Sequence, residues 1–154
     1  MLITVLSQYA TEHYQPRPSS ICISITGTII PQAVIPDGYI EILRLRFDDV
    51  HDHQRDPGAQ PFTLDMAAQI AKFVSRHQSV EEIVIHCHQG VSRSAGVAMA
   101  LADVFAGGHA EKAFEYRLPE HHRKVRVLTR GACQRVAIQK QAVDVRSGLG
   151  NPLL

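Results

Sequence analysis

The chain has 154 residues, of which 45% are hydrophobic and 20% are charged, a composition typical of one soluble globular domain. The formal net charge of +1 provides no overall field to attract nucleic acid or a membrane surface. No apolar run is long enough to span a bilayer, and the start "MLITVLSQYATEHY" lacks the features of a signal peptide. The three cysteines are too few and too irregularly spaced for a disulfide framework, and free thiols are typical of a reducing compartment. We therefore predict a cytoplasmic protein.

The first part of the chain alternates β-branched segments with turn-forming ones. Strands are predicted over 1–6 ("MLITVL"), 20–26 ("SICISIT") and 41–47 ("EILRLRF"). The segment 29–40 carries two prolines and an Asp-Gly pair, which predicts a loop or an edge segment. The polar segment 48–61, "DDVHDHQRDPGAQP", predicts a loop of the length that functional loops reach.

The second part of the chain is mainly helical in pattern. Apolar residues recur at helical spacing through "FTLDMAAQIAKFVSRHQ", and Thr63 is a candidate N-cap. The remaining elements are predicted as a buried strand over 81–87, an alanine-rich helix over 91–108 that stops at Gly107-Gly108, a short helix over 109–118 and a last helix within 128–148. Strands that alternate with helices indicate a single α/β domain over residues 1–154, with a central, mostly parallel sheet of four or five strands flanked by helices.

One loop carries a pattern of chemical interest. In "IVIHCHQGVSRSAG", residues 83–96, a buried strand ends at Cys87 and a helix begins near Arg93. The carboxyl end of such a strand is where α/β proteins bind ligands, and the helix N-terminus favours an anion. Gly90 permits a tight turn, and the planar Arg93 guanidinium can grip two oxygens. The same groups would stabilise a thiolate and lower the pKa of Cys87, and Ser94 can donate a hydrogen bond to its sulfur, so the loop suits nucleophilic attack on phosphorus.

The segment "HCHQGVSRS" resembles the signature loop HCxxGxxR(S/T) of the cysteine-dependent protein tyrosine phosphatases, and its "SRS" ending is similar to the dual-specificity branch. The matching positions are His86, Cys87, Gly90, Arg93 and Ser94. Upstream, "PSSICISIT", "LRLRFDDV" and "FTLDMAAQIAKFV" follow in an order similar to small bacterial phosphatases of this superfamily, so the resemblance covers roughly residues 1–118. It implies a dual-specificity phosphatase-like fold and hydrolysis of phosphomonoesters through a phosphocysteine intermediate, without a metal or cofactor.

The resemblance also implies roles for individual residues. Cys87 is the nucleophile, and Ser94 assists breakdown of the phosphocysteine. The phosphoryl oxygens are bound by the loop residues His88, Gln89, Gly90, Val91, Ser92 and Arg93. The general acid is an aspartate on an upstream loop that follows a strand, and "RFDDVHDH" offers three candidates, Asp49 first, then Asp48 and then Asp52. The sequence does not separate these candidates, since only one of two adjacent side chains can point into the site.

The expected substrate is a phosphorylated protein or a small phosphomonoester, with no membrane partner and no nucleic acid. The interior of the loop has no lysine of the kind that phosphoinositide-directed relatives place there, which disfavours lipid headgroups. No extended segment would wall a deep phosphotyrosine pocket, so we expect a shallow pocket that accepts phosphotyrosine and also phosphoserine or phosphothreonine.

Other interpretations compete with this one. A rhodanese-like sulfurtransferase also places a cysteine in an amide-lined loop, and a catalytically inactive phosphate-binding module would keep the same cradle. The "HDH" run at 51–53, together with His86 and His88, invites a metal site but lacks a third ligand at a telling spacing. We expect His86 to be a partly buried ring that holds the cysteine loop, Cys22 and Cys133 to be core residues, and "HHRKVRVLTR" to form a solvated charged face.

Overall fold

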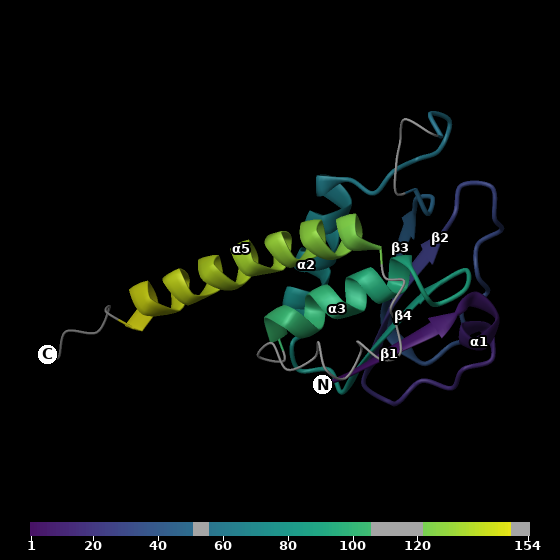
Figure 1. The fold of residues 1–154 in the computed structure, drawn as a ribbon. Coiled ribbons are helices and arrows are strands. Elements are labelled where there is room, and N and C mark those ends of the chain that lie inside the picture. The colour runs from purple at the N-terminus through teal and green to yellow at the C-terminus, as the bar shows by residue number, and fades with distance from the viewer. Residues whose placement is uncertain (51–55, 106–121, 149–154) are drawn as a thin grey trace, which may run out of the picture.

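The computed structural model describes residues 1–50, 56–105 and 122–148 of the chain (Figure 1). The described elements are, in chain order, β1 (Leu2–Ser7), α1 (Gln8–Glu12), β2 (Ser20–Thr26), β3 (Tyr39–Arg46), α2 (Leu64–Arg76), β4 (Glu82–Cys87), α3 (Arg93–Phe105) and α5 (Arg123–Gly148). Strands and helices alternate along most of this order, as the sequence predicts.

The four strands form one sheet in the order β1-β4-β2-β3, and all three pairings are parallel. The predicted α/β class with a parallel central sheet is therefore confirmed. Every residue of the two central strands, β2 and β4, is buried, as expected for parallel strands that are covered on both faces. In the register between β1 and β4, Ser7 lies opposite Cys87, so both strands end at the same edge of the sheet.

Most of the predicted elements are present. All four predicted strands form, and the predicted N-cap of α2 is confirmed because the Thr63 hydroxyl accepts a hydrogen bond from the Met66 amide at 3.2 Å. Helix α5 begins at Arg123, earlier than the segment 128–148 in which it was predicted. The short helix α1 was not predicted, and Ser7 caps it through the Ala10 amide. The predicted stop at Gly107-Gly108 and the predicted helix over 109–118 lie outside the described residues.

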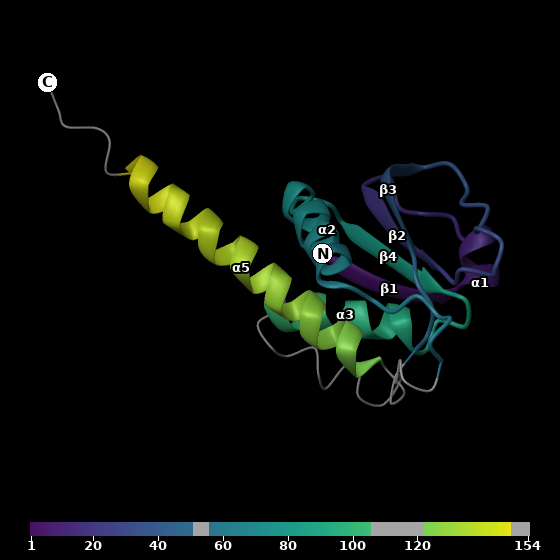
Figure 2. The same cartoon turned by 90° about the horizontal axis from the view of Figure 1, so that it is seen from above.

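Helices α2, α3 and α5 gather on one side of the sheet, and α5 runs past the other two before its C-terminal part extends away from them (Figures 1 and 2). Helices α3 and α5 approach closely at Gly96, where an added Cβ would lie 2.7 Å from the His122 carbonyl oxygen and 3.1 Å from Val125 Cβ. The Arg126 guanidinium also binds the Asp103 carboxylate, at 3.1 Å from Nε and 3.0 Å from Nη2. These contacts hold the start of α5 against α3, at Gly96 near the beginning of α3 and at Asp103 near its end.

The basic segment "HHRKVRVLTR" forms the first turns of α5 from Arg123 onward, while His122 precedes the helix and the residue before it is outside the described part of the chain. Arg123, Lys124 and Arg130 are exposed, whereas Val125 and Thr129 are buried. The segment is therefore a half-buried helix whose charged side faces solvent. Within the described ranges, no helix combines the length and the apolar character needed to cross a membrane.

Candidate active site

The loop between β4 and α3 brings the sequence motif together at the carboxyl edge of the sheet. β4 ends at Cys87 and α3 begins at Arg93, so residues 88–92 form a short bend between them. This bend encloses a cavity of about 230 Å³, which is lined by Asp49, Cys87, His88, Gln89, Val91, Ser92 and Arg93. The predicted nucleophile, the predicted binding loop and one predicted acid thus meet at one hollow.

Gly90 makes the tight bend possible. Its φ of +79° lies in the left-handed region, and an added Cβ would come within 2.7 Å of the Leu6 carbonyl carbon and 2.8 Å of the Ser7 nitrogen. The close approach of Gly90 to Leu6 and Ser7 packs the loop against the end of β1. The Gln8 amide also donates a hydrogen bond to the His88 carbonyl at 3.1 Å. No side chain fits at position 90 without displacing the loop.

The Cys87 thiol is buried at the base of the cavity, with 2% of the residue exposed. Its Sγ lies 3.1 Å from Ser94 Oγ and accepts a hydrogen bond from the Gly90 amide at 3.3 Å. Burial alone would raise the pKa of Cys87, but bonds from the Ser94 hydroxyl and backbone and from Gly90, together with the positive charge of Arg93, outweigh burial and lower it. The sulfur is therefore held in an environment that favours the reactive thiolate.

The other two cysteines behave differently. Cys22 on β2 and Cys133 on α5 are both free and fully buried in the core, as the sequence predicts. Burial raises the pKa of each to about 12, and among the described residues no hydrogen bond to either sulfur offsets this effect. Of the three thiols, Cys87 is the one prepared for nucleophilic chemistry.

Arg93 is a buried cation, with 6% of the residue exposed, and its side chain lines the cavity. Nη1 donates a hydrogen bond to the Phe47 carbonyl at 2.8 Å. Within the described part of the chain, its buried Nε has no hydrogen-bond partner. A buried donor on a charged group is costly unless it is paired, so this arrangement suits an anion placed in the cavity.

The two adjacent aspartates on the loop after β3 point to different places. Asp48 is turned away from the cavity. Its Oδ1 accepts a hydrogen bond from the Thr28 amide at 2.8 Å, and its Oδ2 accepts bonds from the Thr28 hydroxyl at 2.7 Å and the Gln60 amide at 2.9 Å. Partial burial would raise the pKa of Asp48, but these bonds outweigh burial and lower the pKa. Asp48 is therefore ionised, and its hydrogen bonds connect the loops that contain Thr28 and Gln60.

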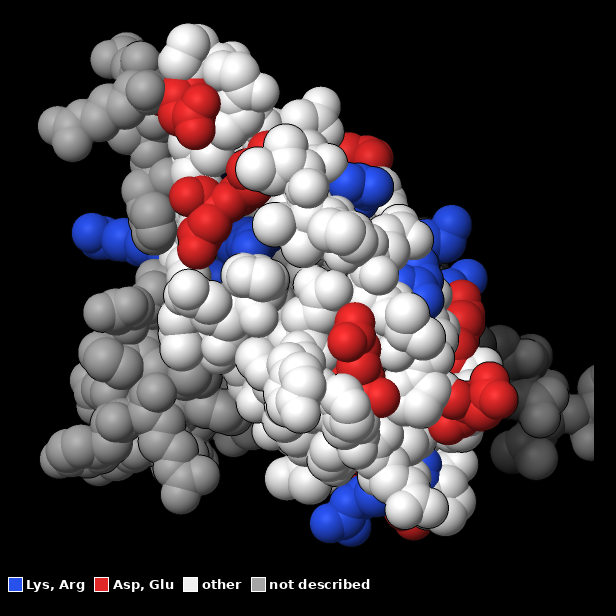
Figure 3. All heavy atoms as spheres, turned by 90° about the vertical axis from the view of Figure 1, so that its right-hand side faces the viewer, with Lys and Arg blue, Asp and Glu red and all other residues white. Residues whose placement is uncertain are grey.

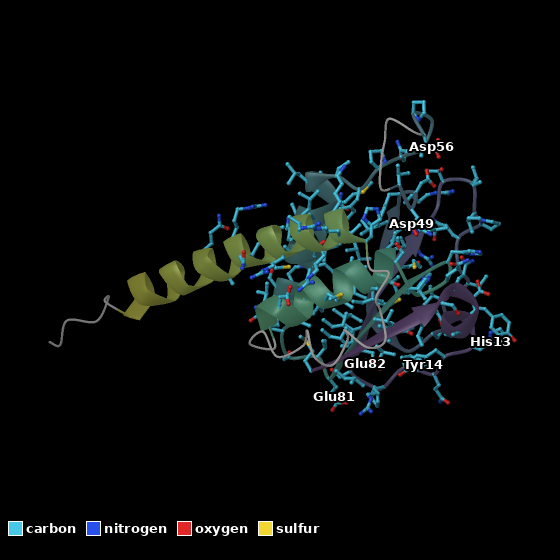
Figure 4. All side chains as sticks on the ribbon, viewed as in Figure 1. His13, Tyr14, Asp49, Asp56, Glu81 and Glu82 are labelled. Carbon is cyan, nitrogen blue, oxygen red and sulfur yellow. The ribbon has the colours of Figure 1, made fainter. Side chains whose placement is uncertain are left out.

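Asp49, by contrast, lines the cavity beside Cys87, and 39% of its side chain is exposed. Its Oδ1 accepts a hydrogen bond from the Ser92 hydroxyl at 2.8 Å. Figure 4 shows Asp49 beside the carboxyl ends of the strands, whereas Asp56 lies farther out on the loop. The third candidate acid, Asp52, lies outside the described residues.

His86 is fully buried, deeper than the partly buried ring that was predicted. Its Nε2 lies 2.8 Å from the Ser24 hydroxyl, which joins β4 to β2 one residue before the nucleophile. Burial lowers the pKa of His86 to about 4, so the ring is neutral near neutral pH. The described residues contain no group of three His, Cys, Asp or Glu side chains placed to hold a metal ion, and His51, Asp52 and His53 lie outside them.

His122 also belongs to this site, although the sequence reasoning did not single it out. It precedes α5, is 1% exposed, and its Nε2 lies 3.0 Å from the Val50 carbonyl and 3.8 Å from Asp49 Oδ1. Its backbone amide donates to the Ser92 carbonyl at 3.0 Å. No local motif marks this histidine, because it reaches the site only through the packing of α5 against α3.

Two further hollows adjoin the site. One, of about 370 Å³, shares Asp49 and is also lined by Ile29 and Asp56, and the other, of about 450 Å³, follows the first turns of α5 from His122 to Leu128. The described residues that line these two hollows include no cysteine. Figure 3 looks at the molecule from the side toward which β1 runs in Figure 1, and on this face basic and acidic atoms are interspersed rather than gathered in one broad area of a single charge.

Comparison of the chain with models of known protein families gives no match, and neither does comparison with curated proteins.

Proposed function

We propose that the protein is a metal-independent phosphomonoester phosphatase that acts through a phosphocysteine intermediate. One observation carries the proposal. The buried Cys87 sulfur, with its lowered pKa, lies at the base of the same cavity as the buried Arg93 guanidinium and the amino end of α3. A thiolate beneath an anion-binding cradle is arranged for attack on the centre of a tetrahedral oxyanion.

In the first step, the Cys87 thiolate attacks phosphorus. The S–P bond forms while the bond from phosphorus to the leaving oxygen breaks. Arg93 and the amides of the loop bind the non-bridging oxygens, where charge must be stabilised in the transition state. Asp49, at the rim of the cavity, gives its proton to the leaving oxygen.

In the second step, water attacks the phosphocysteine and the S–P bond breaks. Asp49 is now a carboxylate and accepts the proton from the attacking water. The sulfur leaves as a thiolate, and the Ser94 hydroxyl, 3.1 Å away, stabilises this charge by donating a hydrogen bond. Phosphate leaves and the starting state of the enzyme is restored, with no metal or redox partner needed to balance the reaction.

The substrate that we propose is a phosphorylated protein or a small phosphomonoester. The nucleophile lies in a cavity of about 230 Å³ whose loop side chains, His88, Gln89 and Val91, are exposed. Such a site admits phosphotyrosine as well as the shorter phosphoserine and phosphothreonine. It has no lysine in the loop to bind further phosphates of an inositol headgroup.

The decisive experiment measures hydrolysis of p-nitrophenyl phosphate by the full chain and by the Cys87→Ser variant. We expect the variant to lose at least about a thousandfold in rate, while it still binds vanadate, because serine replaces the nucleophile without disturbing the cradle. Cys133→Ala is the matched control, since it removes a buried thiol far from the cavity and should retain the rate. A Cys87→Ser rate near that of the wild type would overturn the mechanism.

A comparison of substrates with different leaving groups identifies the acid. Asp49→Asn should slow hydrolysis of phenyl phosphate by about a hundredfold, but should affect 2,4-dinitrophenyl phosphate far less, because an activated leaving group needs no proton. Asp48→Asn should instead lower stability and leave the leaving-group dependence intact. Thiocyanate formation from thiosulfate and cyanide, without phosphatase activity, would indicate a sulfurtransferase, and phosphate binding without turnover would indicate a binding module.

A further inference from the structure

The proposed acid lies on a loop, so its position depends on what holds that loop. On one side of Asp49, the Asp48 carboxylate is tied to Thr28 and Gln60. On the other side, the Val50 carbonyl is bound by the His122 ring at 3.0 Å. The backbone of Asp49 is therefore fixed between two anchored neighbours rather than left to move with the loop.

The carboxylate of Asp49 is held as well. The Ser92 hydroxyl donates to its Oδ1 at 2.8 Å. Ser92 is itself rigid, since it is 8% exposed and its carbonyl accepts hydrogen bonds from the Gly96 amide at 2.9 Å and the His122 amide at 3.0 Å. A bond from such a residue fixes the side chain of Asp49 relative to α3, and hence relative to the nucleophile.

The chemistry of His122 defines how it acts. A carbonyl can only accept, so the contact with Val50 requires Nε2 to carry a hydrogen. The 3.8 Å distance from Nε2 to Asp49 Oδ1 is too long for a hydrogen bond. His122 therefore hydrogen-bonds the loop backbone beside the acid and also lies within ion-pair distance of Asp49 Oδ1, whereas Ser92 hydrogen-bonds the carboxylate directly.

We propose that Ser92 and His122 are positioning residues for the general acid, and we name this pair the acid latch. The acid latch holds Asp49 over Cys87 before substrate arrives. Because Oδ1 accepts from Ser92, the transferable proton belongs on Oδ2 of Asp49. This inference rests on the proposed phosphatase function. It assigns a part in proton delivery to the ring of His122 and to the hydroxyl of Ser92.

The test uses steady-state kinetics of the full chain with two leaving groups. His122→Leu and Ser92→Ala should each lower kcat for phenyl phosphate about tenfold more than kcat for 2,4-dinitrophenyl phosphate, because only the poor leaving group needs the acid. His122→Gln retains an N–H donor near the position of Nε2 and should restore most of the loss. Ser92→Ala keeps the loop amide and provides a second variant if His122→Leu does not fold.

His77→Leu is the matched control. Its ring also contacts a backbone carbonyl, that of Phe73 at 2.8 Å, but it caps α2 near Glu41, at the amino end of β3 and far from the cavity. This variant should change neither substrate's kcat. An equal loss on both substrates in His122→Leu and Ser92→Ala, or no loss in either, would overturn the acid latch.

A double-mutant cycle separates positioning from general damage. If His122 acts through Asp49, His122→Leu should cost nothing further for phenyl phosphate once Asp49→Asn is present. Losses that multiply in the double variant would overturn the inference while the phosphatase mechanism stands. A wild-type chain that does not hydrolyse phosphomonoesters would overturn both, so the two failures are distinguishable.

Discussion

Replacement of Ser94 by alanine tests the electrostatics of the nucleophile most directly. Ser94 is fully buried and its Oγ lies 3.1 Å from the Cys87 sulfur. A thiolate can only accept, so in the reactive state Ser94 donates. The substitution removes only the hydroxyl group that donates this bond, and it leaves the Gly90 amide and Arg93 in place.

The expected magnitude follows from the strength of that bond. A hydrogen bond to a charged group contributes about 1.5–3 kcal/mol, and about 1.4 kcal/mol corresponds to a tenfold change in an ionisation equilibrium. In Ser94→Ala, the thiolate population at a fixed pH below the pKa should therefore fall by about ten- to a hundredfold. The pKa of Cys87 should rise toward the ordinary value for a cysteine.

The ultraviolet absorbance of the thiolate, followed against pH with Cys87→Ser as the blank, measures this change. Cys22 and Cys133 do not interfere, because burial raises their pKa values to about 12. Ser75→Ala is the matched control, since that hydroxyl donates to the Lys72 carbonyl on α2, away from the site. A Ser94→Ala titration that coincides with the wild type would refute the assignment of Ser94 as the donor that stabilises the sulfur.

In the proposed mechanism, the same variant should also slow the second chemical step more than the first, because the sulfur is the leaving group in that step. Rapid mixing with p-nitrophenyl phosphate should then show a burst of p-nitrophenol followed by a slower steady rate, with phosphocysteine detectable after an acid quench. A slower rate without a burst or trapped intermediate would mean that Ser94 does not act on breakdown.

Two predictions concern stability. Gly90→Ala should lower the free energy of unfolding by at least about 2 kcal/mol in urea titrations, because the position has φ +79° and the new Cβ would meet the backbone of Leu6. Gly58→Ala is the control, since an added Cβ there meets nothing within 4 Å, and it should change the free energy of unfolding by no more than about 0.5 kcal/mol. Equal stabilities would contradict the close packing of the loop on β1. Burial lowers the pKa of His86 from 6.5 to about 4, so between these two pH values the unfolded chain binds a proton that the folded chain does not. The free energy of unfolding should therefore fall on acidification through this range, by up to about 3 kcal/mol. His86→Gln should remove this part of the pH dependence in urea titrations, and an unchanged slope would show that His86 is not its source.

The strands and most helices were predictable from local pattern because each has a hydrophobic period that matches its element. β2 is continuously β-branched and fully buried, and Thr63 supplies a cap with standard geometry. Helix α1 escaped prediction because it is short and depends on the Ser7 side chain where β1 ends. The start of α5 escaped because no strong cap residue marks it and its first turn is fixed by contact with Gly96.

The choice between Asp48 and Asp49 as the proposed acid shows the limit of local reasoning. Asp48 and Asp49 are adjacent and chemically identical, so no spacing argument distinguishes them. Partners distant in the chain make the difference, since Thr28 and Gln60 bind one carboxylate and Ser92 binds the other.

The arrangement of the loop around Cys87 could be predicted from local sequence, because "HCHQGVSRS" needs only a strand end, a glycine and a helix start to place Cys87, Arg93 and Ser94 together. Those relations span few residues and follow from backbone geometry. The presence of Asp49 in the same cavity as Cys87, and the contact of His122 with the Val50 carbonyl, follow instead from tertiary packing. These contacts join the segments that follow β3 and β4 to the residue that precedes α5, so their distances depend on how the helices pack on the sheet rather than on any local preference of the chain.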